Sequence, residues 1–238
     1  MIKTIQWFAF LWLSMLKPRF KLMRLIRGSD TAARDACAHL IARNWARKAI
    51  AANGSEIHVS GSENVPATGG VLFISNHQSN FDIPVFMGFI PRDKGFIAKK
   101  ELGKIPVFSM WMRYLGCVFI DRGDARQSLL ALNGAAGRMQ QGHCLVIFPE
   151  GTRSTDGSLG QFKPGSLRMA LKANVPIVPV TINGSMNIMP KGSSLIKSAR
   201  VEVIISTPLM PGETAKMDPN TITEKVRNII AANLISTY

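Results

Sequence analysis

The chain has 238 residues, of which 46% are hydrophobic, so it can bury one sizeable core and still carry an appendage. Lysine and arginine number 29 against 15 acidic residues, and the net charge of +14 indicates an anionic partner: nucleic acid, an anionic membrane surface or a phosphorylated substrate. The cysteines Cys37, Cys117 and Cys144 are far apart and form no CxxC or His/Cys cluster, which argues against a disulfide framework or a zinc site and favours a reducing compartment.

The first fifty residues hold ten basic residues against two acidic ones, so they carry +8 of the total charge. Residues 5–16 (IQWFAFLWLSML) are nearly all apolar, but a helix of that length spans about 18 Å and a bilayer core is about 30 Å thick. The basic flank and the lack of a small-x-small site disfavour a signal peptide. Because Trp7 and Trp12 suit a membrane interface, we expect residues 5–27 to lie on a membrane.

A second helix is expected from about residue 30 to Asn53, with Gly54 as its stop. Its apolar stripe is formed by Ala33, Cys37, Ile41 and Trp45, with Arg34, Arg43 and Arg47 off that stripe. Core packing and membrane contact are both open for this helix. We therefore divide the chain into a basic, aromatic membrane-association segment, residues 1–53, and an α/β domain, residues 54–238.

Short β-branched runs alternate with helical stretches through the second part of the chain, which predicts an α/β fold with a mostly parallel, twisted sheet flanked by helices. Capping signals of the S/T/D-x-x-E/Q kind precede two of the helices, at Asp124 with Gln127 and at Thr221 with Glu224. The expected strands are Ile57–Ser60, Val71–Ser75, Cys117–Ile120, Cys144–Phe148, Val175–Thr181 and Val201–Ile205, and the expected helices are Phe81–Ile90, Pro106–Leu115, Ala125–Gln141, Ser166–Ala173 and a last one after Thr221.

An imidazole and a carboxylate follow the strand Val71–Ser75, at His77 and Asp82. Parallel sheets place their chemistry on loops at the carboxyl ends of strands, so this is where a site is expected. Alone, a His with an Asp five residues later is a weak signal, because a local helix cap and a turn residue would look the same.

The segment FPEGTRS, residues 148–154, also leaves a predicted strand. Glycine lets a backbone approach a ligand, and a threonine hydroxyl, backbone amides and an arginine fork can together grip a phosphate. A tight turn with an ion pair between Glu150 and Arg153 is the structural alternative. GCVFIDR, residues 116–122, and IAKKEL, residues 97–102, deliver further basic side chains.

In this order, the segments resemble the motifs of the glycerolipid acyltransferase family. NHQSNFD resembles the first motif, GCVFIDR the second, FPEGTRS the third and VPIVPV, residues 175–180, the fourth. The resemblance covers about residues 55–185. Four motifs in order and at similar spacing are far more specific than any one of them.

The resemblance implies transfer of an acyl chain from a thioester to a lipid hydroxyl, with His77 as general base and Asp82 fixing its tautomer. The contact between the two requires a turn at residues 79–81, because five residues along a regular helix would put the pair some 140° apart. Arg153, with Arg122 and Lys100 favoured over Lys99, would hold the acceptor's phosphate. Further roles are expected for Gly151 and Thr152 (completing that cradle), Glu150 (orienting the basic groups) and Val178 and Pro179 (an acyl-facing wall).

The expected acceptor is 1-acyl-sn-glycerol-3-phosphate (lysophosphatidate), which would give phosphatidate in phospholipid biosynthesis at the cytoplasmic face of a bacterial inner membrane. Glycerol-3-phosphate or another lysolipid is the alternative acceptor. Acyl-CoA or acyl-acyl-carrier protein would be the co-substrate, with no bound metal or prosthetic group. No GxSxG, GxxxxGK[ST] or GxGxxG occurs, which disfavours serine hydrolases and nucleotide-dependent enzymes. A non-catalytic membrane- or nucleic-acid-binding protein is the more distant alternative; nucleic acid is not expected as a partner.

Overall fold

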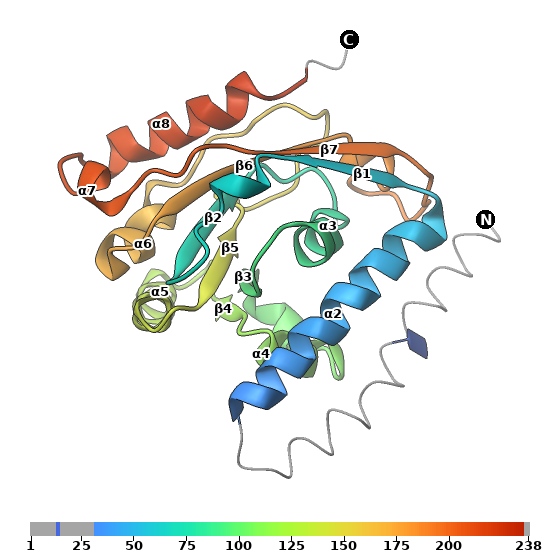
Figure 1. Cartoon of the computed structure of the whole chain (residues 1–238), viewed down its shortest axis with the longest axis horizontal. Coiled ribbons are helices and arrows are strands. Elements are labelled where there is room, and N and C mark those ends of the chain that lie inside the picture. Colours follow the sequence, from blue (N-terminus) through green and yellow to red (C-terminus); the bar gives the residue numbers. More distant parts are fainter. Residues whose placement is uncertain (1–12, 15–30, 236–238) are drawn as a thin grey trace.

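The computed structural model of the chain describes residues 13–14 and 31–235, and its centre is a twisted seven-stranded sheet with helices on both faces (Figure 1). The strand order is β1-β7-β6-β2-β5-β3-β4. Neighbouring strands are parallel except β6 and β7, which are antiparallel. The strands are β1 (Glu56–Ser60), β2 (Val71–Ser75), β3 (Lys94–Lys99), β4 (Val118–Ile120), β5 (Cys144–Ile147), β6 (Ile177–Asn183) and β7 (Arg200–Ile205). The helices are α2 (Thr31–Asn53), α3 (Asp82–Phe89), α4 (Phe108–Tyr114), α5 (Ala125–Gln140), α6 (Arg168–Ala173), α7 (Pro211–Thr214) and α8 (Pro219–Ala232).

The mostly parallel α/β fold is therefore confirmed, with two local corrections. The strand β3 was not predicted, because its sequence KGFIAK begins and ends with lysine and contains a glycine. The cap of the last helix was misplaced: Asp218, not Thr221, is the N-cap, and its carboxylate accepts hydrogen bonds from the amides of Asn220 and Thr221. The cap at Asp124 is as predicted, since its side chain accepts from the Gln127 amide.

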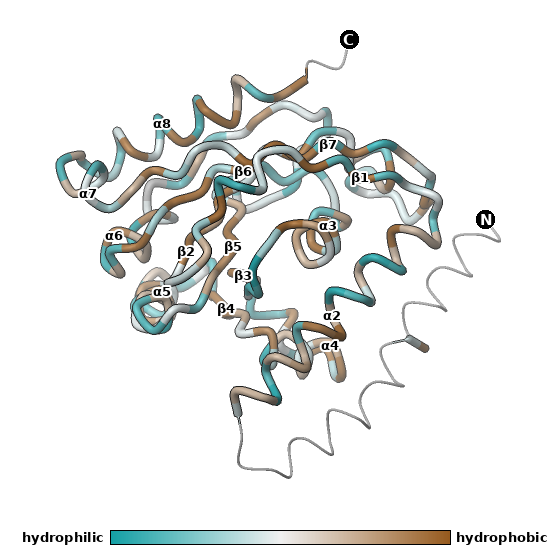
Figure 2. The backbone as a smooth tube through the Cα atoms, viewed as in Figure 1, coloured by the Kyte–Doolittle hydropathy of each residue, from teal (hydrophilic) through white to brown (hydrophobic). Residues whose placement is uncertain are grey.

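Two hydrophobic cores lie on opposite faces of the sheet. Alternate residues of the central strands point to opposite faces, so that Val71 and Phe73 enter one core while Leu72 and Ile74 enter the other. The first core is completed by α2, α3 and α4, and the second by α5, α6 and α8. Figure 2 shows hydrophilic and hydrophobic residues alternating along α8, as expected of a helix that covers a core with one face.

Helix α2 packs against α3 through small side chains. The buried residues are Ala38, Ala42, Ala46, Ala49 and Ile50, a stripe displaced by one position from the predicted one. A Cβ added to Gly88 of α3 would lie 3.3 Å from the Ala46 Cβ, so the two helices approach closely. The close contact between the helices favours alanine, while Ile41 and Trp45 of the predicted stripe lie beside it and are partly buried against the hydrophobic clusters.

The three arginines of α2 contact the protein itself. Arg43 forms an ion pair with Asp93 at 2.7 Å, and Arg47 Nε donates to the Gly88 carbonyl at 2.7 Å. Arg34 pairs with its neighbour Asp35. This arrangement answers the open question on α2 in favour of core packing for its buried face, while the division of the chain after residue 53 stays a prediction.

Four neighbouring parallel strands end at the same edge of the sheet. The carboxyl end of β2 leads to His77, that of β5 to Phe148 and Glu150, that of β3 to Lys99, and that of β4 to Arg122. The four strands β2, β5, β3 and β4 are adjacent in the sheet, so segments as far apart in the chain as those of His77 and Glu150 meet there.

In the part of the chain that the structure describes, we find no helix with the length and apolar character needed to cross a membrane. The predicted membrane segment, residues 5–27, lies almost wholly outside the described residues, of which only Leu13 and Ser14 belong to it.

Candidate active site

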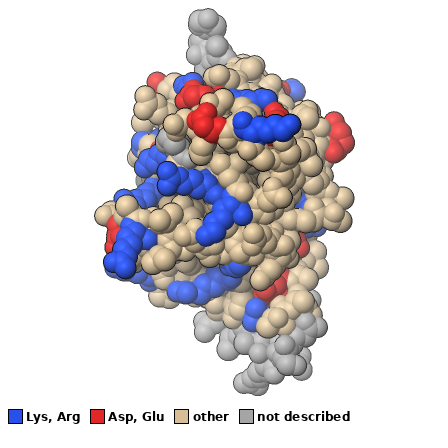
Figure 3. All heavy atoms as spheres, turned by 90° about the vertical axis from the view of Figure 1, so that its left-hand side faces the viewer, with Lys and Arg blue, Asp and Glu red and all other residues tan. Residues whose placement is uncertain are grey.

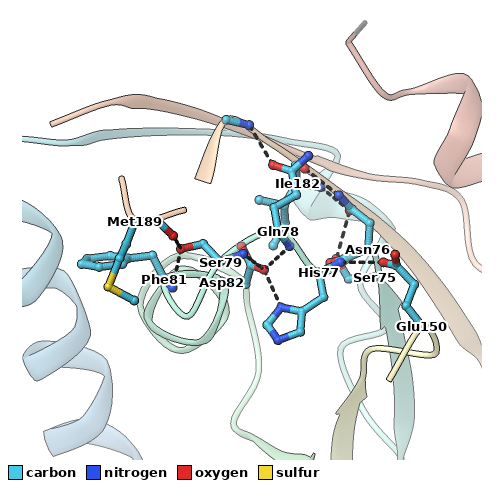
Figure 4. A network of polar contacts seen from close by, with 11 residues as sticks. Ser75, Asn76, His77, Gln78, Ser79, Phe81, Asp82, Glu150, Ile182 and Met189 are labelled. Carbon is cyan, nitrogen blue, oxygen red and sulfur yellow. Dashed lines mark hydrogen bonds and ion pairs between the residues drawn. The ribbon is translucent and has the colours of Figure 1, made fainter. Parts of the chain in front are cut away.

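His77 and Asp82 face each other across a tight loop after β2 (Figure 4). His77 Nδ1 lies 2.7 Å from Asp82 Oδ2. The same carboxylate oxygen accepts hydrogen bonds from the backbone amides of Gln78, at 2.8 Å, and Ser79, at 2.9 Å. The Asp82 amide in turn donates to the Ser79 carbonyl, so the turn required at residues 79–81 is present and α3 begins directly after it.

This geometry assigns the imidazole tautomer. A carboxylate oxygen that accepts from two amides acts as an acceptor toward the ring as well, so Nδ1 carries the hydrogen and donates it to Asp82. Nε2 is then left with a free lone pair. Asp82 is fully buried, and its second oxygen has no hydrogen-bond partner among the described residues, so its negative charge is available to stabilise an imidazolium.

Three polar side chains in the same loop fix its path. The Asn76 amide group pairs with the backbone of Ile182 in β6, with one bond donated and one accepted, both at 2.8 Å. Gln78 accepts from the Gly184 amide, and Ser79 Oγ donates to the Met189 carbonyl at 2.9 Å. The residues around His77 in NHQSNFD thus anchor the loop to β6 and the segment that follows it.

The imidazole is also held by an aromatic ring that the sequence had not marked. Phe148, the first residue of FPEGTRS, stacks on His77 with ring centroids 4.1 Å apart and planes at 16°. Phe86 of α3 meets Phe148 edge-on, at 5.9 Å and 86°. The ring of His77 is therefore fixed both by the Asp82 hydrogen bond and by packing on one face.

Glu150 connects two backbone segments. Its Oε1 accepts from the His77 amide and its Oε2 from the Gly160 amide, both at 2.9 Å. Burial raises the pKa of Glu150, and the two amide bonds oppose that shift. Sequence reasoning expected Glu150 to orient basic groups, but in the described chain both oxygens hold backbone amides, and no ion pair with Arg153 occurs there.

An apolar cavity of about 440 Å³ opens beside His77. Its walls come from α2, α3, β3 and α4, with Trp45, Met87, Phe108 and Trp111 among the large side chains. Volumes of this order accommodate a ligand, and the predominance of apolar walls selects a hydrocarbon. Val178 and Pro179, which were expected to shape such a wall, are instead buried in β6, because that strand has a neighbour on each side and helices over both faces.

Two cations and a glycine also line this cavity. Arg122 and Gly151 belong to its lining, and the Arg122 guanidinium donates to the Gly151 carbonyl. Of the lysine pair, Lys99 lines the cavity, whereas Lys100 does not and forms an ion pair with Asp121 that raises the Lys100 pKa. The preference for Lys100 over Lys99 is therefore not supported by the geometry. Lys99 ends β3 and Lys100 begins the short 3-10 helix that follows, and spacing along the chain alone could not show which of the two faces the cavity.

Thr152 and Arg153 lie on the other side of the Gly151 turn. They line a separate polar hollow of about 560 Å³, together with the segment from Ser154 to Lys163 and with Lys191. The predicted phosphate-binding set is thus divided between two hollows, with Arg122 and Gly151 in one and Thr152 and Arg153 in the other. The Ser154 amide donates to the His77 carbonyl at 2.7 Å, which ties the second hollow to the loop that carries His77.

The arrangement suits proton transfer next to a lipid. An oriented imidazole with a free nitrogen, a buried carboxylate behind it, an apolar cavity beside it and cations within the same cavity can activate a hydroxyl on an amphipathic, anionic molecule. Among the described residues, no serine hydroxyl or cysteine thiol is in hydrogen-bond contact with the His77 imidazole, so this ring has no side-chain nucleophile to activate there.

Comparisons with known proteins point to the same chemistry. The acyltransferase family model matches residues 56–183. A probable 1-acyl-sn-glycerol-3-phosphate acyltransferase of Mycoplasma pneumoniae is 36% identical over 78% of this chain and 72% of its own length, and a chloroplastic 1-acyl-sn-glycerol-3-phosphate acyltransferase of Brassica napus is 36% identical over 83% of this chain and 57% of its own. The crystal structure of the 1-acyl-sn-glycerophosphate acyltransferase PlsC of Thermotoga maritima superimposes with a TM-score of 0.87 at 30% identity, covering 97% of this chain and 92% of that one.

Proposed function

The chain belongs to the acyltransferase family, and from that premise we propose that it acylates the free hydroxyl of 1-acyl-sn-glycerol-3-phosphate, giving phosphatidate for phospholipid synthesis. The observation that carries this proposal is the 2.7 Å contact between His77 Nδ1 and Asp82 Oδ2 in the wall of an apolar cavity. The relatives are named as 1-acyl-sn-glycerol-3-phosphate acyltransferases, which supports this choice of acceptor. The apolar cavity supports a substrate with a hydrocarbon chain.

His77 acts as general base. A lipid hydroxyl is a poor nucleophile at neutral pH, whereas a thioester is already activated, so the enzyme needs a proton acceptor more than a covalent intermediate. As Nε2 takes the hydroxyl proton, the oxygen attacks the thioester carbonyl and a C–O bond forms. The C–S bond then breaks, and the leaving thiolate takes the proton from the imidazolium. Asp82 holds the ring and stabilises its positive charge during this sequence.

The apolar cavity receives a fatty acyl chain. Each buried CH₂ contributes about 0.8 kcal/mol, so affinity should grow with chain length until the cavity is filled. Because the cavity lies beside His77 and Phe148, a chain bound in it would hold the reacting carbonyl or hydroxyl group at the imidazole.

The acceptor's phosphate is proposed to bind to cations near His77. The reacting hydroxyl and the phosphate belong to the same glycerol unit, so the phosphate cannot lie far from the imidazole. Arg122, Gly151 and Lys99 meet that condition because they line the same cavity, whereas Arg153 and Thr152 line the separate hollow beyond the Gly151 turn. Lys100 remains in the proposal only through its ion pair with Asp121, next to Arg122.

We retain a peripheral or monotopic membrane location at the cytoplasmic face, and an acyl-CoA or acyl-acyl-carrier protein donor, as parts of the same proposal. The short apolar segment with its basic flank, residues 5–27, supports membrane contact. Because the acceptor resides in a bilayer, membrane binding would bring the enzyme to its substrate.

The deciding experiment uses the purified full chain with lysophosphatidate and with each thioester donor in turn, and measures phosphatidate. We expect product with the wild type and none above background with His77→Ala, while lysophosphatidate binding is nearly unchanged. Glycerol-3-phosphate and other lysolipids serve as competing acceptors. Turnover of His77→Ala at the wild-type rate would end the proposed mechanism, and a stronger preference for another acceptor would replace lysophosphatidate.

A further inference from the structure

The polar hollow on the far side of the Gly151 turn contains a cation that no sequence motif marks. Lys163 follows Phe162 in the segment GQFKPG, ten residues beyond Arg153, and it lines the hollow with Arg153 and Lys191. Its ammonium lies against the turn itself, because a Cβ added to Gly151 would be 3.1 Å from Lys163 Nζ and 3.3 Å from its Cε. Lys163 therefore reaches the wall that separates the hollow from the cavity of His77.

The acids that share the hollow form no ion pair with its cations within the described residues. Glu150 is occupied by the amides of His77 and Gly160. Asp156 accepts bonds from Ser154 and Ser158, which lower its pKa. Within the described residues, the ammonium of Lys163 and the guanidinium of Arg153 have no carboxylate partner.

Charge density alone would not single out this place. Figure 3 shows lysine and arginine side chains gathered across the face of the molecule that carries α5, α6 and α7, as a net charge of +14 requires. What distinguishes the hollow is that three cationic side chains, Arg153, Lys163 and Lys191, line one concave surface together with several hydroxyl-bearing residues.

The backbone around Lys163 is anchored in advance. The Lys163 amide donates to the Pro149 carbonyl at 3.1 Å, and Phe162 is buried in the second core. Arg227 of α8 donates to the carbonyls of Gly160 and Leu159. Lys191 Nζ donates to the Arg153 carbonyl at 2.9 Å, which brings the segment after β6 over the same hollow. A site whose cations are carried by anchored segments loses less conformational entropy when an anion binds.

We propose that this hollow is a phosphoryl-binding site in which Lys163 and Lys191 act together with Arg153. The inference rests on the proposed function, because both substrates of that reaction carry phosphate: the acceptor on its glycerol and the thioester donor on its pantetheine arm. Because Lys163 contacts the Gly151 turn, a phosphoryl group bound to it would lie next to the loop of His77. Glu150 and the Ser154 amide both form hydrogen bonds with the backbone of His77, so they connect that loop to the segment that carries the turn.

The test compares Lys163→Gln and Lys191→Gln with Lys163→Arg, which keeps the charge, and with Lys216→Gln, an exposed lysine outside both hollows. KM is measured for lysophosphatidate at saturating donor and for the donor at saturating lysophosphatidate. We expect the KM of one substrate to rise about tenfold in Lys163→Gln, less in Lys191→Gln, with kcat within about twofold. Lys163→Arg should retain most of the affinity, and Lys216→Gln should behave as wild type.

The two KM measurements identify which substrate supplies the phosphoryl group. A rise confined to the lysophosphatidate KM assigns the site to the acceptor, and one confined to the donor KM assigns it to the pantetheine phosphate. Unchanged KM values, equal rises in both, or a fall in kcat alone would overturn the proposal, because these indicate no role or a disturbed loop.

A second measurement does not depend on turnover. Inorganic pyrophosphate should raise the unfolding temperature of the wild type and of Lys216→Gln but not that of Lys163→Gln. If the wild type forms no phosphatidate, the proposed function fails while this measurement still decides on the anion site. Equal stabilisation of all three proteins by pyrophosphate would exclude the site.

Discussion

The loop that carries His77 and the segments that carry the surrounding cations are held in different ways. Around His77, a carboxylate, two amides, an aromatic ring and three polar side chains fix one short stretch of chain. The cations are more exposed and come from four separate segments. A proton-transfer group must be placed to within a fraction of an ångström, whereas a phosphate can be held by several adaptable donors. This difference leads to mutational effects of different size and kind.

After removal of the imidazole itself, the largest effect is expected for Asp82→Asn, the smallest change that can be made to the fixed loop. The amide oxygen of asparagine can still accept from the ring and the two backbone amides, so the geometry should persist while the negative charge is lost. We expect kcat to fall by about 10²–10⁴-fold with little change in either KM. Single-turnover kinetics would measure this, with circular dichroism as a control for folding. A kcat within threefold of wild type would show that the charge on Asp82 is not needed.

Lys94→Met tests the stability of the helix that supports the loop, separately from the chemistry at His77. Lys94 is buried at the other end of α3 from Asp82, and its ammonium donates to the carbonyls of Ile90, at 2.8 Å, and Phe86, at 3.1 Å. Methionine has a similar length but no donor, so those carbonyls would lose their partner. We expect the free energy of unfolding near pH 7 to fall by about 1–3 kcal/mol, measured by urea denaturation.

The same lysine gives the wild type a pH dependence with a defined sign. Burial lowers the pKa of Lys94 to about 7 from an ordinary value of 10.5. Between these two values, the unfolded chain binds the proton that the folded chain has released, so raising the pH favours the folded state. The stability difference between wild type and Lys94→Met should therefore increase from pH 7 to pH 10, by on the order of 1 kcal/mol per pH unit, and be constant below pH 6. A difference that does not change with pH would mean that the ammonium stays charged in the fold.

Contacts between residues close in the chain could be predicted from the sequence, whereas contacts between distant segments could not. The contact of His77 with Asp82 and the turn between them are encoded within six residues, so spacing and chain geometry were enough to anticipate them. Whether Lys99 or Lys100 lines the cavity depends on the direction in which the end of β3 faces. The strand β3 itself was not predicted, because a lysine stands at each of its ends.

Contacts that bring distant segments together carried no readable local signal. The stacking of Phe148 on His77 joins residues 71 positions apart, and the approach of Lys163 to Gly151 depends on how the segment between them folds back. Glu150 was expected to orient basic groups, with Arg153 three residues along the chain, but its amide partners come from other segments. Only the three-dimensional arrangement of strands β2 and β5 makes these pairs visible.

The smallest and most discriminating effect is expected from two adjacent lysines, Lys99 at the end of β3 and Lys100 directly after it. Lys99 lines the cavity of His77 and is only loosely paired, 3.5 Å from Glu101, whereas Lys100 is paired with Asp121 on the protein's own surface. Lys99→Gln should therefore raise the KM for lysophosphatidate about three- to tenfold, while Lys100→Gln changes it less than twofold, since surface ion pairs contribute little. Both substitutions remove one positive charge, so a general electrostatic attraction of the substrate would weaken equally in each. Equal KM changes in the two variants would show that the cations act as a diffuse field, and a larger change in Lys100→Gln would restore the assignment made from the sequence.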